Sequence, residues 1–222
     1  MKLLVLDVEG TLFQTSIRLP GTLVDSTIWQ AIAHALGPAA VEEEVNTHVK
    51  WERGEYSSYV EWMKATVAIH QRHRLSQHVF SGLISSAEYN PGVVDTLRQI
   101  DRSQYELVLI SGGFRELAAR AQSDLKIVHA FAACEYIFSE GGSLEAYNLL
   151  PCDFEGKIDF IRLMIREYQL NQDDWVFVGD GANDVAIAKV APMSVGYRPH
   201  PELRRVATHA IDEFGELIGL LD

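Results

Sequence analysis

Two carboxylates stand directly after the first apolar run of the chain. The segment LLVLDVEGTLF, residues 3–13, is apolar over its first four positions and then reaches Asp7 and Glu9, two residues apart. Neighbouring carboxylates raise each other's pKa unless a cation neutralises them. The pattern therefore indicates that two acids are needed here for chemistry rather than for packing.

Further polar residues follow later apolar runs. A Ser-Gly-Gly segment comes after YELVLI, and the segment GDGANDVAIA comes after DWVFV. Ligands of open parallel sheets bind beyond the carboxyl ends of the strands, so we expect the residues at these ends to converge. Together with a lysine at the start of an intervening helix, the converging residues are Asp7, Glu9, Thr11, Ser111, Gly112, Gly113, Lys157, Asp180 and Asp184.

These residue types suit metal-assisted phosphoryl chemistry. Oxygen-only ligands favour a hard cation, Mg²⁺ above all. Ser111, the glycine amides and Lys157 are suited to phosphate oxygens, helped by a helix N-terminus. Asp7 can attack phosphorus and form an aspartyl phosphate. Glu9 can protonate the leaving oxygen and later deprotonate the attacking water.

An alternation of strands and helices positions these residues. Short runs rich in Val, Ile and Leu, apolar on consecutive positions, suit parallel strands covered on both faces. Helices are expected between them, at about 91–101 and at 157–168, where Ile158, Ile161, Ile165 and Tyr168 share one stripe. This alternation predicts a three-layer α/β fold with a doubly wound parallel sheet. The predicted strands are 2–7, 105–110, 127–133, 174–178 and 193–197.

The pattern changes between residues 14 and 88, where no strand is predicted. Helices are expected there at about 24–36, 40–53, 56–74 and 76–86. This interval is interpreted as a helical insertion after the first strand, which gives a core domain of residues 1–14 and 88–222 and a cap domain of residues 15–87. A smaller hairpin is predicted at 135–148, with Gly141-Gly142 at its turn.

Taken in order, these motifs resemble the haloacid dehalogenase superfamily, and within it the phosphoserine phosphatase-like branch. The resemblance rests on DVEGT at 7–11, LISGG at 109–113, Lys157 and VGDGANDVAIA at 178–188. It implies a Rossmann-like core with a helical cap and a Mg²⁺-dependent phosphatase that works through an aspartyl phosphate.

The resemblance also implies a role for each site residue. Asp7 corresponds to the nucleophile and Glu9 to the acid/base, with Lys157 as a further catalytic group. Mg²⁺ would be held by Asp7, the backbone carbonyl of Glu9 and Asp180, with Asp184 in support. The residues around the phosphate would be Thr11, Ser111, Gly112, Lys157 and Asn183.

Two departures from the family pattern bear on substrate. Glu9 stands where the family usually has aspartate, so its longer side chain must deliver the proton from a shifted position. Phosphoserine phosphatases hold the amino acid with a cap glutamate and a cap arginine, and Ser16 and Met63 stand near those positions here. Lys64 or Arg53 would have to substitute, but a lysine does not replace a bidentate guanidinium. A substrate other than phosphoserine is therefore expected.

Composition narrows the classes of partner. The chain has 222 residues and a formal charge of −12, from 31 acidic and 19 basic side chains. Such a surface repels a nucleic acid backbone, and no apolar run approaches the roughly 20 residues of a membrane span. The two cysteines lack CxxC spacing, so they indicate neither a zinc site nor a disulfide framework. A cytoplasmic protein acting on a small phosphorylated metabolite is expected, with no nucleic acid or membrane partner, and the oligomeric state is left open.

Other interpretations remain open at this stage. A phosphotransferase would pass the phosphoryl group from Asp7 to a second alcohol, and a non-catalytic sensor would bind a phosphometabolite without turnover. Three histidines, His70, His73 and His78, lie close together, where a solvated surface is favoured over a metal site. The aromatic residues of the insertion suit either its core or a pocket for an apolar leaving group; they are Trp29, Trp51, Trp62, Tyr56 and Tyr59.

Overall fold

The computed structural model describes residues 1–19 and 22–221, and the chain divides into two compact units. The first unit comprises Met1–Gln14, Tyr89–Ala133 and Cys152–Asp222, and the second comprises Thr15–Glu88 and Cys134–Pro151. Within the described ranges, no helix combines the length and the apolar character needed to cross a bilayer.

A seven-stranded sheet forms the centre of the fold, and it confirms the predicted α/β class. Its order is β6-β5-β4-β1-β7-β8-β9. The strands are β1 (Lys2–Leu6), β4 (Tyr105–Phe114), β5 (His129–Phe138), β6 (Leu144–Leu149), β7 (Trp175–Gly179), β8 (Met193–Tyr197) and β9 (His209–Ile211).

The central strand β1 lies between β4 and β7 and is parallel to both. Leu6, its last residue, pairs with Leu109 of β4 and with Val178 of β7. The parallel ladder continues through β8 and β9. Because parallel strands end at the same edge of a sheet, this register brings together the residues that come after Leu6, Leu109 and Val178.

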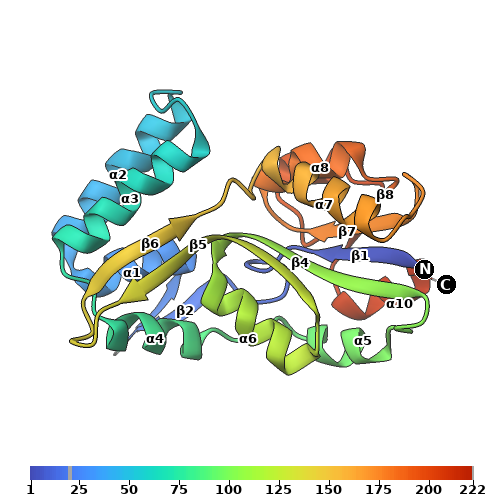
Figure 1. The fold of residues 1–222 in the computed structure, drawn as a ribbon, viewed down its shortest axis with the longest axis horizontal. Helices are drawn as coiled ribbons and strands as arrows, with labels where there is room; N and C mark the ends of the chain where they lie inside the picture. The colour runs from blue at the N-terminus through green and yellow to red at the C-terminus, as the bar shows by residue number, and fades with distance from the viewer. Residues whose placement is uncertain (20–21, 222) are drawn as a thin grey trace. The chain divides into compact units, whose positions relative to one another are not determined.

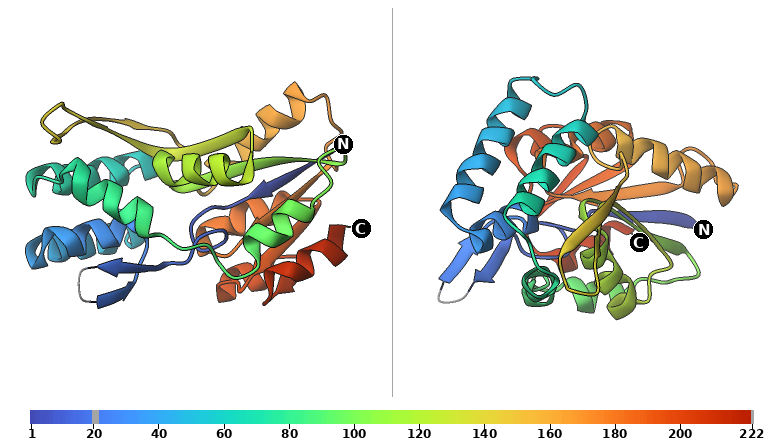
Figure 2. Two further views of the ribbon diagram at one scale, coloured as in Figure 1. Left: turned by 90° about the horizontal axis from the view of Figure 1, so that it is seen from below. Right: turned by 60° about the vertical axis from the view of Figure 1, so that its left-hand side comes forward.

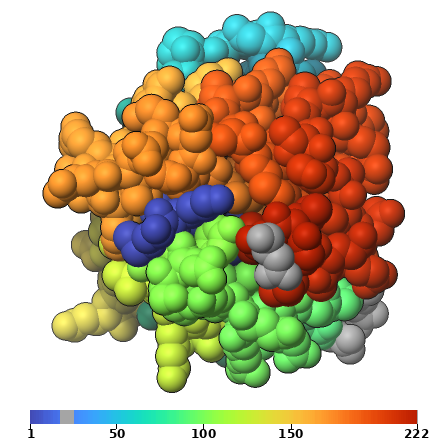
Figure 3. Space-filling view, turned by 90° about the vertical axis from the view of Figure 1, so that its right-hand side faces the viewer, coloured from blue at the N-terminus to red at the C-terminus, as the bar shows by residue number. Residues whose placement is uncertain are grey.

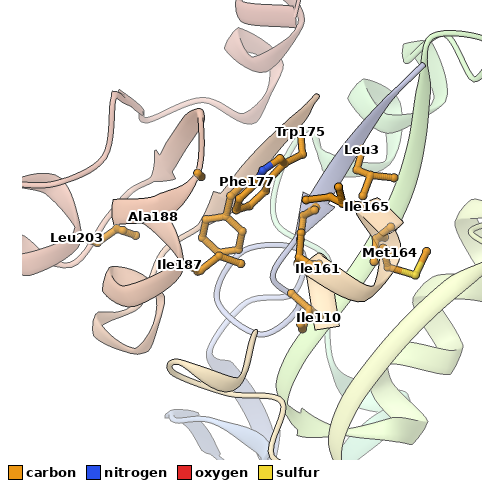
Figure 4. Close-up of a cluster of buried hydrophobic side chains, with 13 residues drawn as sticks. Leu3, Ile110, Ile161, Met164, Ile165, Trp175, Phe177, Ile187, Ala188 and Leu203 are labelled. Atoms are coloured by element: carbon orange, nitrogen blue, oxygen red, sulfur yellow. The ribbon is translucent and has the colours of Figure 1, made fainter. Parts of the chain in front are cut away.

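Helices cover both faces of the sheet in the first unit. α5 (Val93–Gln99) and α6 (Arg115–Leu125) lie on one side, and α7 (Gly156–Glu167) and α8 (Val185–Val190) lie on the other (Figure 1). The predicted stripe of α7 is confirmed, because Ile161 and Ile165 pack with Leu3 and Trp175 in one buried cluster (Figure 4). This packing fixes the start of α7 against the sheet.

Short elements complete the first unit. They are the 3₁₀ helix η1 (Ala182–Asp184), α9 (Pro201–Arg204), the 3₁₀ helix η2 (Phe214–Leu217) and α10 (Ile218–Leu221). The N-terminal residues lie between the segments that lead into β4 and β7 (Figure 3), and the N–H groups of Lys2 and Leu3 donate to the carbonyls of Gln104 and Asp174.

The second unit holds the four predicted helices of the insertion, and α2 and α3 run side by side in it (Figure 2). The prediction that this interval lacks strands was wrong, because β2 (Ser16–Leu19) and β3 (Thr22–Asp25) pair in an antiparallel hairpin. The first strand, SIRL, alternates polar and apolar residues, but one such short run is a weak signal, and the second strand, TLVD, does not alternate. The helices are α1 (Ile28–Leu36), α2 (Pro38–Glu52), α3 (Tyr59–Arg72) and α4 (Gln77–Ser86).

The start of α1 has a local cause. We expected this helix to begin near residue 24, but it begins at Ile28 because Thr27 caps it. The Thr27 hydroxyl accepts the N–H of Gln30, and the Gln30 side chain accepts the N–H of Thr27. This reciprocal capping box defines a helix N-terminus.

The β5–β6 hairpin is present where the sequence predicted one, with Gly142 at a φ of 76° in its turn. β5 extends further than expected, since one strand, from His129 to Phe138, joins most of the predicted run at 127–133 to the first arm of the hairpin. Residues 134–151 belong to the second unit, although their sequence position predicted that they form part of the core domain.

Candidate active site

Three carboxylates gather at the carboxyl edge of the sheet. Asp7 follows β1, and Asp180 and Asp184 follow β7. One ligand oxygen from each lies within 4.8 Å of the others. Asp7 is 4% exposed and Asp184 is fully buried. The structure therefore brings together three of the four predicted metal ligands.

Burial strongly affects the protonation of this acidic group. Desolvation, together with the charges of Asp184 and Asp180, raises the pKa of Asp7 well above its usual value although Lys157 opposes the shift. Desolvation and the charge of Asp184 likewise raise the pKa of Asp180 to about 7. Carboxyl groups that resist ionisation at neutral pH mark a site whose negative charge is not fully compensated.

Lys157 is the cation at the centre of the group. Its Nζ is buried and donates to Asp7 Oδ1 and to Asp184 Oδ1, each at 2.6 Å. Burial disfavours the charged ammonium, but Asp184, Asp7 and Asp153 outweigh this effect and raise the pKa of Lys157. The residue lies in the first turn of α7, where the helix dipole disfavours a cation, so its carboxylate partners are what stabilise its charge.

Backbone and hydroxyl donors hold the two aspartates that follow β7. Asp184 Oδ2 accepts the N–H groups of Asp180 and Gly181 at 3.0 and 3.1 Å. Thr11 donates from Oγ1 to Asp180 Oδ1 at 2.8 Å, so its hydroxyl is engaged by a carboxylate. Gly10 has a φ of 89°, and a Cβ there would overlap the Asp180 carboxyl group. Only glycine permits this close approach.

The segment after Leu109 continues as strand through Phe114 before α6 begins at Arg115. The buried Ser111 hydroxyl accepts the N–H of Gly113 at 3.0 Å. The Glu9 carboxylate lies against Gly113, since a Cβ on this glycine would come within 2.8 Å of Glu9 Oε2. Glu9 is not a member of the carboxylate group defined above, within the described residues.

A further carboxylate, the buried Asp153, belongs to the site but was not among the predicted residues. Asp153 Oδ1 accepts the Asn183 side-chain amide at 2.8 Å and lies 3.6 Å from Lys157 Nζ. A Cβ on Gly112 would overlap its carboxyl group. The available signal was its spacing of four residues from Lys157, which is typical of ion pairs near a helix start.

The second unit gives the remaining predicted residues separate roles. Met63, near the position of the family's cap arginine, is 3% exposed. His70 Nδ1 bonds the Tyr136 hydroxyl at 2.6 Å, and His73 Nε2 lies 2.9 Å from a Glu43 oxygen. His70 is fully buried, so the expectation of a solvated surface was wrong for this residue.

The predicted aromatic residues of the second unit form two groups. Trp51 and Trp62 stack with ring centroids 4.9 Å apart, and Tyr59 meets both edge-on. Trp29 instead stacks on His70. The rings of Trp51, Trp62 and Tyr59 are only partly buried, so they do not form a closed core.

The site combines oxygen ligands for a divalent cation with neighbouring hydrogen-bond donors for an anion. Buried oxygen ligands with raised pKa values suit a hard cation, while one ammonium, one amide and the glycine backbone lie beside them. A parallel α/β sheet with this arrangement at its carboxyl edge is typical of hydrolases of the haloacid dehalogenase type.

A family model described as "Hydrolase: haloacid dehalogenase-like hydrolase" matches residues 1–192. The chain belongs to this family, and the resemblance inferred from its motifs is confirmed.

Curated relatives are similar to the chain at low identity. The phosphoserine phosphatase of Lactococcus lactis subsp. lactis is 25% identical over 138 residues, which cover 61% of this chain and 62% of that protein. Phosphoserine phosphatase SerB2 of Mycobacterium tuberculosis is 27% identical over 209 residues, covering 93% of this chain and 46% of that protein. The chain thus spans less than two thirds of the length of either relative.

Solved structures agree with the fold. A phospho-aspartyl intermediate analogue of phosphoserine phosphatase superposes with a TM-score of 0.78 at 20% identity, covering 99% of this chain and 98% of that one. A substrate-bound phosphoserine phosphatase complex has the same TM-score at 19% identity, covering 99% and 97%.

Proposed function

We propose that the chain is a Mg²⁺-dependent phosphatase that hydrolyses a small phosphomonoester through an aspartyl phosphate on Asp7. The observation that carries this proposal is the buried Lys157 ammonium bonded to Asp7 and Asp184 inside the acidic group. The names of the relatives and of the phospho-aspartyl analogue structure support it.

The donor set fits Mg²⁺. Asp7, Asp180 and the backbone carbonyl of Glu9 would hold the ion, with Asp184 in support, since the carboxylate oxygens of the three aspartates already converge. When bound, Mg²⁺ would neutralise the carboxylates and the charge of the phosphate.

The chain's own residues account for both half-reactions. Lys157 orients Asp7, whose carboxylate oxygen attacks phosphorus and forms the aspartyl phosphate as the ester P–O bond breaks. Glu9 gives its proton to the departing alkoxide. It then takes a proton from water, which attacks phosphorus and releases inorganic phosphate and the Asp7 carboxylate. The phosphate would lie among Thr11, Ser111, Gly112, Lys157 and Asn183.

Substrate choice is assigned to the second unit, acting as a cap. Ser16 and Met63 offer neither a carboxylate nor a guanidinium for the amino acid part of phosphoserine, and the Met63 side chain is buried. We therefore propose a phosphomonoester other than phosphoserine, although the relatives carry that name.

A phosphate-release screen tests the function. Purified protein with Mg²⁺ is assayed against phosphoserine, sugar phosphates, nucleotides, glycolytic acids and aromatic esters, with Asp7→Asn as the blank and Asp159→Asn, an exposed charge on α7, as the matched control. We expect turnover that EDTA abolishes and that Asp7→Asn lowers at least about 10³-fold. Turnover that survives in Asp7→Asn would exclude the aspartyl phosphate, and a clear preference for phosphoserine would contradict the substrate proposal.

A further inference from the structure

The Asp153 carboxylate lies among the groups that the proposed function assigns to phosphate. It accepts the Asn183 amide at 2.8 Å, lies 3.6 Å from the Lys157 ammonium and abuts Gly112. These are three of the five residues expected around the phosphate. The Asp153 carboxylate, itself an anion, therefore already lies against the groups that would bind the phosphate of a substrate.

Burial and backbone geometry keep the carboxylate turned inward. Asp153 is 8% exposed, and its carbonyl accepts the N–H of Gly156 at 2.9 Å. The next residue, Phe154, has a φ of 48°, a left-handed conformation that a bulky side chain rarely adopts. The backbone of the loop before α7 is therefore strained at Phe154, the residue next to Asp153.

A charged Asp153 carboxylate that stays on these donors would compete with a phosphate dianion for them and repel it. Two like charges a few ångströms apart repel strongly where water is largely excluded. The overlap with any Cβ on Gly112 also means that the carboxylate fills the space against the Gly112 backbone. A phosphate that bound in that same space would have to displace the Asp153 side chain.

We propose that Asp153 is an internal anion that occupies the phosphate position in the free protein, yields to the substrate and competes with the phosphate product. The proposal rests on the proposed function for the location of that position. It assigns Asp153 a direct effect on affinity for phosphate, rather than the alternative of positioning Asn183 and Lys157. The two roles predict opposite results on truncation, because loss of a competitor tightens phosphate binding whereas loss of a positioning group weakens it.

The test is the dissociation constant of inorganic phosphate, measured by titration calorimetry on the full chain with Mg²⁺. Asp153→Ala should bind phosphate about tenfold more tightly than the wild type, and Asp153→Asn should also tighten binding, since it removes the charge and keeps the size. Asp159→Asn removes a charge from the same helix at a side chain that is 78% exposed, so it should leave the constant unchanged.

Each result decides whether Asp153 competes with phosphate or positions Asn183 and Lys157. Unchanged or weaker binding in Asp153→Asn would overturn the proposal, and this nearly isosteric variant keeps the test valid if the alanine variant fails to fold. Tighter binding in a protein that hydrolyses no ester would contradict the proposed function but retain the role of Asp153. No phosphate binding by any variant would overturn both. For a turned-over ester, KM should fall in Asp153→Asn more than kcat changes.

Discussion

At the scale of single residues, the site is defined by unequal charge. One buried ammonium, Lys157, faces the carboxylates of Asp7, Asp184 and Asp153, and Asp180 lies in the same acidic group. Burial makes this excess of negative charge costly, which is why the pKa values of Asp7 and Asp180 are raised. A divalent cation is the simplest group that would remove this cost.

The raised pKa values predict how Mg²⁺ affinity depends on pH. Without the cation, Asp180 holds its proton up to a pH of about 7, and a ligand carboxylate must lose that proton to bind metal. The stabilisation that Mg²⁺ gives should therefore grow as pH rises from about 5 to about 7, because over this range the proton on Asp180 competes with the ion. Unfolding temperatures measured with and without Mg²⁺ across this range check it.

The comparison with and without Mg²⁺ at each pH serves as its own control. Buried groups elsewhere also make stability depend on pH over this range, such as His70, whose pKa burial lowers from 6.5 to about 3, and Glu44, whose pKa burial raises from 4.5 to about 8. Their effects cancel in the difference. A Mg²⁺ effect of equal size at pH 5 and pH 8 would contradict ligation by these carboxylates.

At the scale of elements, the stability of a helix end depends on the backbone conformation of its cap residue. α6, which follows the Ser-Gly-Gly segment, ends at Lys126 with a φ of 54° and a ψ of 48°. Its N–H donates to the carbonyl of Gln122. This left-handed position is the one that glycine occupies in many helix C-caps, and a residue with a Cβ is strained there.

Replacement of Lys126 by glycine should therefore stabilise the protein. Relief of the left-handed conformation outweighs the greater chain entropy of unfolded glycine, so we expect the free energy of unfolding to rise by about 0.5 kcal/mol or more. Urea denaturation measures this change. Lys126→Ala is the matched control, since it also removes the exposed side chain but keeps the Cβ, and it should not stabilise. Equal gains in both variants would assign the effect to the lysine charge.

At the scale of the whole molecule, the acidic group belongs entirely to one of the two units. Asp7, Asp180 and Asp184 lie in the first unit, on the segments that directly succeed β1 and β7. The second unit has its own apolar cluster, in which Ala33, Ala40 and Ile69 pack together. Among the described residues, the carboxylates that would bind a cation therefore belong to the first unit.

This division predicts a local response to Mg²⁺ in hydrogen exchange. Amides of β1, β7 and η1 should exchange more slowly with Mg²⁺, because ligation fixes the segments that carry the carboxylates. Amides of α2 and α3 should change little. Mass spectrometry of the exchanged chain, with Asp7→Asn as a comparison that weakens the site, measures both. Equal protection of α2 and β7 would contradict two separately responding units.

The sequence by itself determined most elements of the first unit and the polar residues that follow its strands. The apolar runs before Asp7, Ser111 and Asp180 predicted the parallel strands, because a strand buried on both faces leaves a continuous local signal. The stripe of α7 was predicted for a similar reason, since its period lies within one helix. The motifs at the strand ends then sufficed to indicate the family.

Only the tertiary structure decided which side chains meet. Thr11 bonds Asp180 across 169 positions of sequence, and Asp153 bonds Asn183 across 30, so no local pattern records either contact. The pairing of β2 with β3 escaped prediction because β3, TLVD, has no alternation of its own and β2 alternates over only four residues. Long-range hydrogen bonds and burial arise only when the chain folds. They bring acidic residues that are far apart in the sequence together in one charged site.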